Sequence, residues 1–323
     1  MTRRNLGSLV LGTVLASGDA VSQPRDWPTR PIRMIVPYGP GGATDTLIRL
    51  WGARLSTILG QSVLIENRPG GNTAIGAEVV LRAPRDGHTL FFAGGGAFLS
   101  APLLQALSYD PLREFQGVSI VGSNGMLMTV NRDIPPRDLD GFIAWARANP
   151  GTVNAASSSL GTSSHLAPVL LAQRAGIDIT VVPYPGFPQM LGDLVGGRVQ
   201  ALFGNPADML PHVQSGSLRA LAVTSERRMP QLPDVPALAE RYPDAVFTTW
   251  NGLFAPAGTP RPVIETLARH MTEIGREPEM RRRLADLGID PDERTPEQVD
   301  ATLRQEAPIY ATLLRASGLG RAG

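Results

Sequence analysis

The stretch from Ile32 to Leu55 constrains the fold of this chain more than any other part of the sequence. It begins with an apolar run suited to a buried strand, breaks at a proline–glycine turn, and continues with apolar side chains at helical spacing. Such a turn brings backbone N–H groups and the positive end of a helix dipole to one point. Gly41 and Gly42 have no Cβ, so a ligand can approach the backbone closely there. The stretch predicts either an anion site or an ordinary strand-to-helix connection.

The rest of the chain alternates strands and helices at the spacing typical of parallel βαβ units. We expect strands at residues 32–36, 62–67, 89–93, 118–121, 126–130, 153–156, 180–183, 199–203, 218–223 and 247–255. Residues 153–174 repeat the opening pattern of strand, small-residue turn and helix start, here with serine and threonine hydroxyls as additional donors. Because ligands of such sheets bind at the carboxyl ends of the strands, the two turns predict two α/β lobes that face each other.

The last predicted helix runs from Pro296 to Arg315. Its apolar residues fall on one helical face, which should be buried. They are Val299, Leu303, Ile309, Leu313 and Leu314.

The first 22 residues have the pattern of a secretory signal peptide. Arg3 and Arg4 form a basic start, residues 6–17 are weakly apolar and too short to span a bilayer, and residues 20–22 are small. Cleavage after Ser22 removes two of the 30 basic and one of the 29 acidic residues, so the mature chain has no net charge. We expect a soluble protein outside the cytoplasm; the sequence does not decide between the Sec and Tat export routes.

Composition excludes several kinds of chemistry. The chain has no cysteine, which rules out disulfides and thiol catalysis, and every basic residue is arginine. Without lysine there is no Schiff base and no Walker-type phosphate loop. The near-zero net charge gives no indication of nucleic acid or of an anionic membrane as a partner.

No catalytic residue, metal site or cofactor is predicted. Ser164 and His165 are adjacent on a predicted helix, where successive side chains point about 100° apart and cannot form a nucleophile–base pair with each other. The remaining histidines are scattered without the spacing of metal ligands. Asp45 and Asp193 lie at or near helix starts, where a carboxylate usually caps the helix.

Motifs in a fixed order along the whole mature chain carry a family resemblance. They lie at residues 27–32, 37–45, 66–70, 158–166, 182–184, 218–225, 232–236, 250–252 and 255–260. Together they resemble the Bug family, the TctC-like substrate-binding proteins of tripartite tricarboxylate transporters. The resemblance implies a two-lobed periplasmic binding protein fold of type II, in which each lobe is a mainly parallel sheet flanked by helices. It implies a discontinuous domain 1 at residues 24–130 plus 250–323, and a domain 2 at residues 131–249.

In this family, the turns after the first strand of each domain hold a carboxylate from opposite sides, largely through backbone donors and ordered water. On the matching positions, the expected ligand-binding residues are Tyr38, Gly41, Gly42, Ala43, Thr44, Asp45, Asn72, Ser158, Gly161, Thr162, Ser163, Ser164, Tyr184 and Asn205. Asp45 would either repel a second negative charge or accept an ammonium group. The sequence departs from the family pattern at residues 70–72, 94–96, 185 and 205, so the resemblance does not identify the ligand.

The resemblance implies a monomeric solute-binding protein that passes a small carboxylate to membrane permease subunits. Two alternatives remain from the sequence. The protein would report its ligand to a sensor kinase, or it would be an extracytoplasmic enzyme that uses the same cleft.

Overall fold

The computed structural model describes residues 27–158, 160–184 and 186–319. Its strands are β1 Ile32–Val36, β2 Val63–Asn67, β3 Thr89–Gly94, β4 Phe115–Gly125, β5 Leu127–Asn131, β6 Asn154–Ser157, β7 Thr180–Pro183, β8 Ala201–Gly204, β9 Leu218–Val223 and β10 Thr248–Pro256. Its helices are α1 Ala43–Leu59, α2 Ala74–Leu81, α3 Gly95–Leu104, α4 Pro111–Glu114, α5 Leu139–Ala148, α6 Ser163–Ala175, α7 Phe187–Val195, α8 Pro206–Gln214, α9 Leu238–Arg241, α10 Arg261–Arg276, α11 Pro278–Asp286 and α12 Pro296–Ala316, with a short 3₁₀ turn η1 at Gly71–Thr73.

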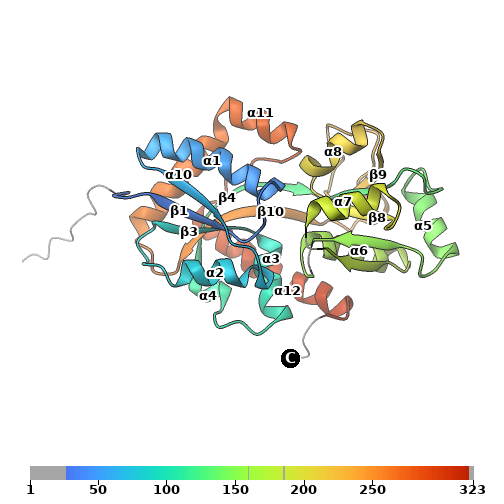
Figure 1. The fold of residues 1–323 in the computed structure, drawn as a ribbon, viewed down its shortest axis with the longest axis horizontal. Helices are drawn as coiled ribbons and strands as arrows, with labels where there is room; N and C mark the ends of the chain where they lie inside the picture. The colour runs from blue at the N-terminus through green and yellow to red at the C-terminus, as the bar shows by residue number, and fades with distance from the viewer. Residues whose placement is uncertain (1–26, 159, 185, 320–323) are drawn as a thin grey trace, which may run out of the picture.

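The strands form two five-stranded sheets, each the centre of one lobe (Figure 1). The first lobe has the order β2-β1-β3-β10-β4, and the second has the order β7-β6-β8-β5-β9. In each sheet one strand runs against its neighbours: β10 is antiparallel to β3 and β4, and β5 is antiparallel to β8 and β9. These are the strands by which the chain enters each sheet from the other lobe. The two-lobed α/β fold expected from the sequence is confirmed.

Helices cover both faces of the first sheet because its strands are apolar on both sides. In β1, Ile32, Met34 and Val36 pack with α1, α10 and α11, whereas Ile35 points to the opposite face, which α2, α3 and α12 cover. The alternation follows from the two-residue repeat of a strand. Trp51 of α1 anchors this side: it is 1% exposed.

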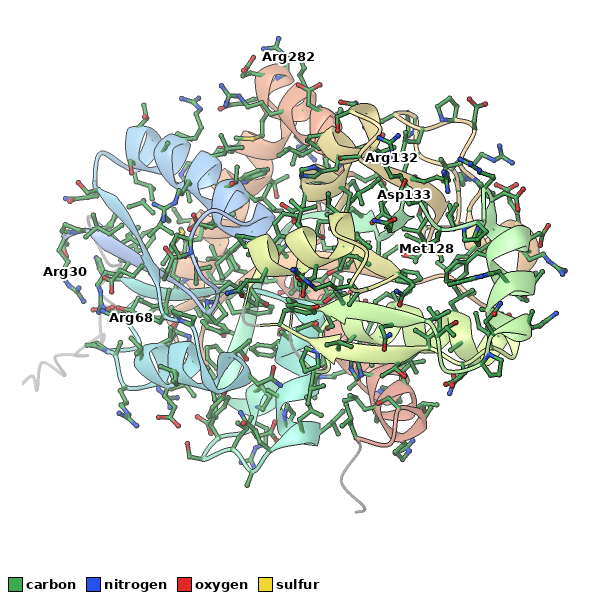
Figure 2. All side chains as sticks on the ribbon, turned by 45° about the vertical axis from the view of Figure 1, so that its right-hand side comes forward. Arg30, Arg68, Met128, Arg132, Asp133 and Arg282 are labelled. Atoms are coloured by element: carbon green, nitrogen blue, oxygen red, sulfur yellow. The ribbon has the colours of Figure 1, made fainter. Side chains whose placement is uncertain are left out.

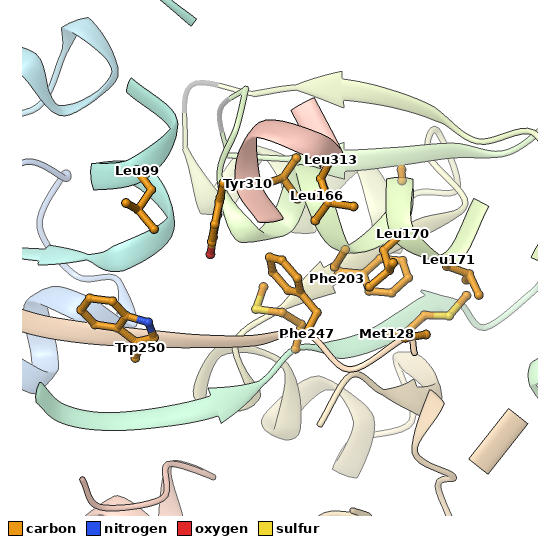
Figure 3. Packing of buried hydrophobic residues seen from close by; sticks show 14 of the residues in the cluster. Leu99, Met128, Leu166, Leu170, Leu171, Phe203, Phe247, Trp250, Tyr310 and Leu313 are labelled. Atoms are coloured by element: carbon orange, nitrogen blue, oxygen red, sulfur yellow. The ribbon is translucent and has the colours of Figure 1, made fainter. Parts of the chain in front are cut away.

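The apolar core continues from one lobe into the other through α12 (Figure 3). Tyr310 and Leu313 of this helix join a cluster that includes Leu99 of the first lobe and Leu166 of the second. The sequence assigned Ile309 to the buried face, which is wrong, because Ile309 is 54% exposed while the neighbouring Tyr310 is 3% exposed. The other four predicted residues of this face are buried, so only Ile309 falls outside it, and Tyr310 takes its place with the phenol toward the second lobe.

The chain crosses between the lobes at two points that touch. At the first crossing, Met126 donates its N–H to the Thr224 hydroxyl at 2.7 Å, and at the second, Phe247 donates to the Thr224 carbonyl at 2.8 Å. The expected division placed residues up to 130 in domain 1, but β5 pairs with strands of the second sheet. We propose domain boundaries at these two crossings, near Met126 and near Phe247.

The predicted signal peptide at residues 1–22 lies outside the described residues. Within residues 27–319, apart from 159 and 185, none of the helices has both the length and the apolar character needed to cross a membrane.

Candidate ligand-binding site

Helix α1 starts directly after the turn that follows β1. Gly41 has a φ of 85°, in the left-handed region that favours glycine, whereas Gly42 is the N-cap with a φ of −84°, which any residue adopts. Ala43 is the first helical residue, and no side chain caps the helix. The first N–H groups of α1 therefore have no intrahelical acceptor and are available to a ligand.

Asp45 holds this turn in shape. Its carboxylate accepts the Gly41 N–H at 3.0 Å, two bonds from the Arg49 guanidinium at 2.9 Å each, and the Asn67 amide at 2.9 Å. Burial alone would raise the pKa of Asp45, but the bonds from Arg49, Gly41 and Asn67 bring it below its usual value. Since Arg49 already neutralises this carboxylate, the structure supports neither of the two ligand-tuning roles expected for Asp45.

Helix α6 starts in the same way in the second lobe. Gly161 has a φ of 75°, Thr162 is the N-cap, and no side chain caps the helix. The Ser164 hydroxyl lies at the centre of the turn, 3.1 Å from the Ser158 N–H and 3.0 Å from the Thr162 hydroxyl. Ser164 is thus buried as part of the scaffold, while Ser158 is exposed.

Strand β10 connects the two helix starts. The Thr44 hydroxyl at the start of α1 donates to Asn251 Oδ1 at 3.0 Å, and the Ser163 hydroxyl at the start of α6 donates to the Thr249 hydroxyl at 3.1 Å. Residues two apart on a strand share one face. One face of β10 therefore contacts both helix starts, which brings the two predicted turns to opposite sides of one polar region.

Two tyrosines complete this polar region. The Tyr38 hydroxyl accepts the Gly94 N–H at 3.1 Å, and the Tyr310 hydroxyl of α12 hydrogen-bonds with Ser163. Burial raises the pKa of Tyr38 to about 12, although the Gly94 bond acts in the opposite direction, and burial raises the pKa of Tyr310 as well. Both phenols are therefore neutral hydrogen-bonding groups at neutral pH.

The three glycines at residues 94–96 leave space for aromatic rings. They form the end of β3 and the first turn of α3, rather than an open turn. A Cβ on Gly95 would lie under 3.0 Å from three atoms of the Trp250 ring, and one on Gly96 would lie 2.7 Å from the Tyr310 hydroxyl. The rings of Trp250 from β10 and Tyr310 from α12 thus fill the space that side chains at these positions would occupy.

Three residues expected in the site are not among those that join the two helix starts. The Tyr184 hydroxyl donates to Asp193 of α7 at 2.8 Å, and Asn72 lies in η1 with a φ of 48°. Asn205 is the N-cap of α8 and accepts a bond from Asn124 of β4 at 3.3 Å, so it contacts the first lobe. Asn205 follows β8, the parallel neighbour of β6, and hence lies at the same sheet edge as the turn before α6.

Asp208 of α8 should make stability depend on pH. Burial raises its pKa to about 6, against a hydrogen bond from Asn205 that acts in the opposite direction. The folded state then holds the proton more tightly than the unfolded chain, so this residue lowers stability as the pH rises from about 4 to about 6. Asp208→Asn should therefore raise the free energy of unfolding by about 1–2 kcal/mol near pH 7.5 and leave it unchanged near pH 4.

Urea denaturation at both pH values measures this effect. Asp193→Asn is the matched control with the opposite sign, because Tyr184 and Arg198 lower the pKa of Asp193. An equal change for Asp208→Asn at the two pH values would contradict the assignment.

Sequence reasoning missed three residues that join the helix starts: Thr249, Asn251 and Tyr310. The sequence could have identified the first two, because they lie on the predicted strand at residues 247–255 and Asn251 belongs to one of the family motifs. The indication for Tyr310 was weaker: it is the neighbour of Ile309, which was assigned to the buried face of the last helix.

Of two surface hollows, one lies away from the helix starts, and the other extends to Leu160 and His165 beside the start of α6. One, of about 400 Å³, is lined by Arg132, Asp133, Arg137 and Arg219 among others, and Figure 2 places the first two on the second lobe. The other, of about 330 Å³, lies between α6 and the end of α12. In the part of the chain that the structure describes, no three histidine or acidic residues are grouped so as to hold a metal ion.

Solved structures of similar chains share this architecture. The periplasmic binding protein BugD superposes with a TM-score of 0.82 at 30% identity, and covers 91% of this chain and 99% of its own. A protein from R. palustris, solved with adipate, has a TM-score of 0.86 at 32% identity and covers 91% of this chain and 99% of its own. MatC from Rhodopseudomonas palustris, solved with malate, has a TM-score of 0.81 at 29% identity and covers 89% of this chain and 100% of its own. The fold and these likenesses define a periplasmic-type solute-binding protein rather than an enzyme.

The sequence comparisons identify the family. The sequence model of the tripartite tricarboxylate transporter family receptor, TctC, matches residues 47–319. Protein BugT of Bordetella pertussis is 35% identical over 295 residues, which cover 90% of each chain. The chain belongs to this family of periplasmic solute-binding proteins, as its motifs predict.

Proposed function

We propose that this protein captures a small carboxylate between the starts of α1 and α6 and presents it to a tripartite tricarboxylate-type transporter. The observation that carries the proposal is the pair of uncapped helix starts joined across one face of β10. Similar proteins solved with adipate and with malate support a carboxylate as the ligand. We further propose that residues 1–22 direct export to the periplasm and are removed there.

The chemistry of the site fits a carboxylate held without a cationic partner. A carboxylate that leaves water needs several donors, and two helix starts supply backbone N–H groups and favourable dipoles from two sides. The hydroxyls of Thr44 and Ser163 lie at these starts. Each charge-assisted hydrogen bond contributes about 1.5–3 kcal/mol, so two opposed sets of donors suffice for micromolar affinity after the cost of association.

Calorimetric titration with matched ligands tests this function. We expect adipate, malate or a related dicarboxylate to bind with a dissociation constant on the order of micromolar. The corresponding diamide should bind at least about 100-fold more weakly, because it lacks the negative charge that the helix starts stabilise. Equal affinity for acid and diamide, or binding of neutral solutes only, would contradict the proposal.

Transport is tested in cells. Deleting the gene should abolish uptake of the ligand that titration identifies, and expression of the parent chain should restore it. Normal uptake in the deletion strain would contradict the transport role while leaving ligand capture intact.

A further inference from the structure

A buried histidine on α6 contacts the turn that precedes its own helix. His165 is 3% exposed, and its Nδ1 accepts the Gly161 N–H at 2.9 Å. A ring nitrogen accepts a hydrogen bond only when it carries no proton. The contact therefore requires a neutral ring with its proton on Nε2.

The carbonyl of the same glycine is held by the first lobe. The Ser100 hydroxyl of α3 donates to the Gly161 carbonyl at 2.5 Å, and both groups are buried. Gly161 has a φ of 75°, and a Cβ there would lie under 3.0 Å from the side chains of Ser100 and Leu104. Gly161 is thus fixed through its N–H, its carbonyl and its packing, and the next residue of the chain is the N-cap of α6.

We propose that neutral His165 is a positioning residue for the carboxylate site: by accepting the Gly161 N–H, it holds the turn so that the start of α6 faces the ligand. This inference rests on the proposed function. A second proton would occupy Nδ1 and turn the acceptor into a donor that faces the Gly161 N–H. The turn must then move, so carboxylate affinity falls when His165 becomes protonated.

The surroundings of the ring favour the neutral form. His165 lines the hollow between α6 and the end of α12, whose walls are mostly apolar; among the described residues that line it, Asp178 is the one with a charged side chain. Burial lowers the pKa of His165 below its ordinary value of 6.5. Of the groups that contact Gly161 and the start of α6, Tyr310 of α12 is neutral, and α3 contributes Ser100 and Leu104, which carry no charge.

A bound carboxylate would act against this preference, because its negative charge favours the protonated ring by attraction. Protonation, however, breaks the Gly161 contact in every case. The sign of the effect of pH on affinity therefore tests whether that contact controls the site.

Two variants separate the loss of the hydrogen-bond acceptor at residue 165 from the protonation of the His165 ring. His165→Asn places an amide oxygen near the position of Nδ1, and so keeps an acceptor that does not titrate. His165→Leu keeps an apolar side chain of similar bulk and removes the acceptor. The matched control is His212→Asn on α8, which makes the same substitution elsewhere on the second lobe.

Titration with adipate and malate measures the affinities at about pH 7.5 and at a lower pH at which nuclear magnetic resonance shows the His165 ring of the folded protein to be protonated. We expect His165→Leu to bind about tenfold more weakly than the parent at the higher pH, the equivalent of one lost hydrogen bond, and His165→Asn to bind more tightly than His165→Leu. Between the two pH values, the parent and His212→Asn should lose more affinity than His165→Asn. Protonation of the ligand affects all variants alike, so the difference between them isolates His165. An equal loss in parent and His165→Asn, or tighter binding by the parent at the lower pH, would overturn the proposal.

Nuclear magnetic resonance of the parent without ligand tests the contact between His165 and Gly161 independently of the proposed function. We expect the Nε2–H form of His165 and a high protection factor of the Gly161 amide against hydrogen exchange at about pH 7.5, with a lower protection factor once the ring is protonated. A proton on Nδ1, or a Gly161 protection factor that does not change when His165 titrates, would overturn the inference. Failure of every carboxylate to bind, with these signals as expected, would instead refute the proposed function and with it the ligand-positioning role.

Discussion

Replacing Gly42 with valine is expected to weaken carboxylate binding at least about 100-fold and to leave the protein folded. A side chain at the N-cap of α1 would occupy the space above the first N–H groups of the helix, and the loss of two charge-assisted hydrogen bonds accounts for this factor. The backbone angle does not contribute to this effect, because Gly42 has a φ of −84° that valine adopts without strain. Calorimetric titration of parent and variant measures the effect.

Valine at residue 42 should affect binding without disturbing the packing of the fold. A Cβ on Gly42 meets no atom within 4 Å. Valine is a poorer N-cap than glycine, so we expect a loss of stability of about 1 kcal/mol or less. Gly39→Val is the matched control, because it is open in the same way and a β-branched residue suits the position before Pro40. We expect the control to bind within about threefold of the parent. Parental affinity in folded Gly42→Val would show that the helix start is not the site.

Gly95→Ala is expected to lower the free energy of unfolding by about 2–3 kcal/mol, the cost of overpacking a core. The added methyl would overlap the Trp250 ring, which is 2% exposed. The ring cannot turn away easily, because its Nε1 donates to both carboxylate oxygens of Glu306 at 3.0 and 2.9 Å. Urea denaturation measures the loss.

A second glycine provides the comparison for this stability effect. Gly192 lies inside α7, where an added Cβ meets no atom within 4 Å. Alanine is the better helix former, so Gly192→Ala should be neutral or should stabilise the protein by about 0.5–1 kcal/mol. If Gly95→Ala were as stable as Gly192→Ala, Trp250 would not be fixed against β3 and α3 as described.

Local patterns were sufficient to predict the strands and the two helix starts of the candidate site. The apolar run at residues 32–36 and the helical spacing after it correspond to β1 and α1, and the second turn and helix correspond to the start of α6. Periodicity carries no information on strand direction, however. The reversed orientation of β5 and β10 follows from the crossings between the lobes, which join residues far apart in the sequence.

The details of the site depended on long-range contacts that no local pattern contains. The Asp45 carboxylate, expected to tune the ligand, accepts a hydrogen bond from the distant Asn67 of β2 as well as from Arg49, which lies one helical turn away. The glycines at residues 94–96 could not be explained until Trp250 and Tyr310 were placed against them. The backbone turns were predictable because glycine and helix-start patterns are local, whereas the side chains that join them come from β10 and α12.

A crystal structure of the complex with the carboxylate that titration identifies tests the central claim most directly. We predict carboxylate oxygens within about 3 Å of backbone N–H groups at the start of α1, residues 42–44, and at the start of α6, residues 163–164. A carboxylate bound in either surface hollow, with both helix starts left to water, would contradict the claim.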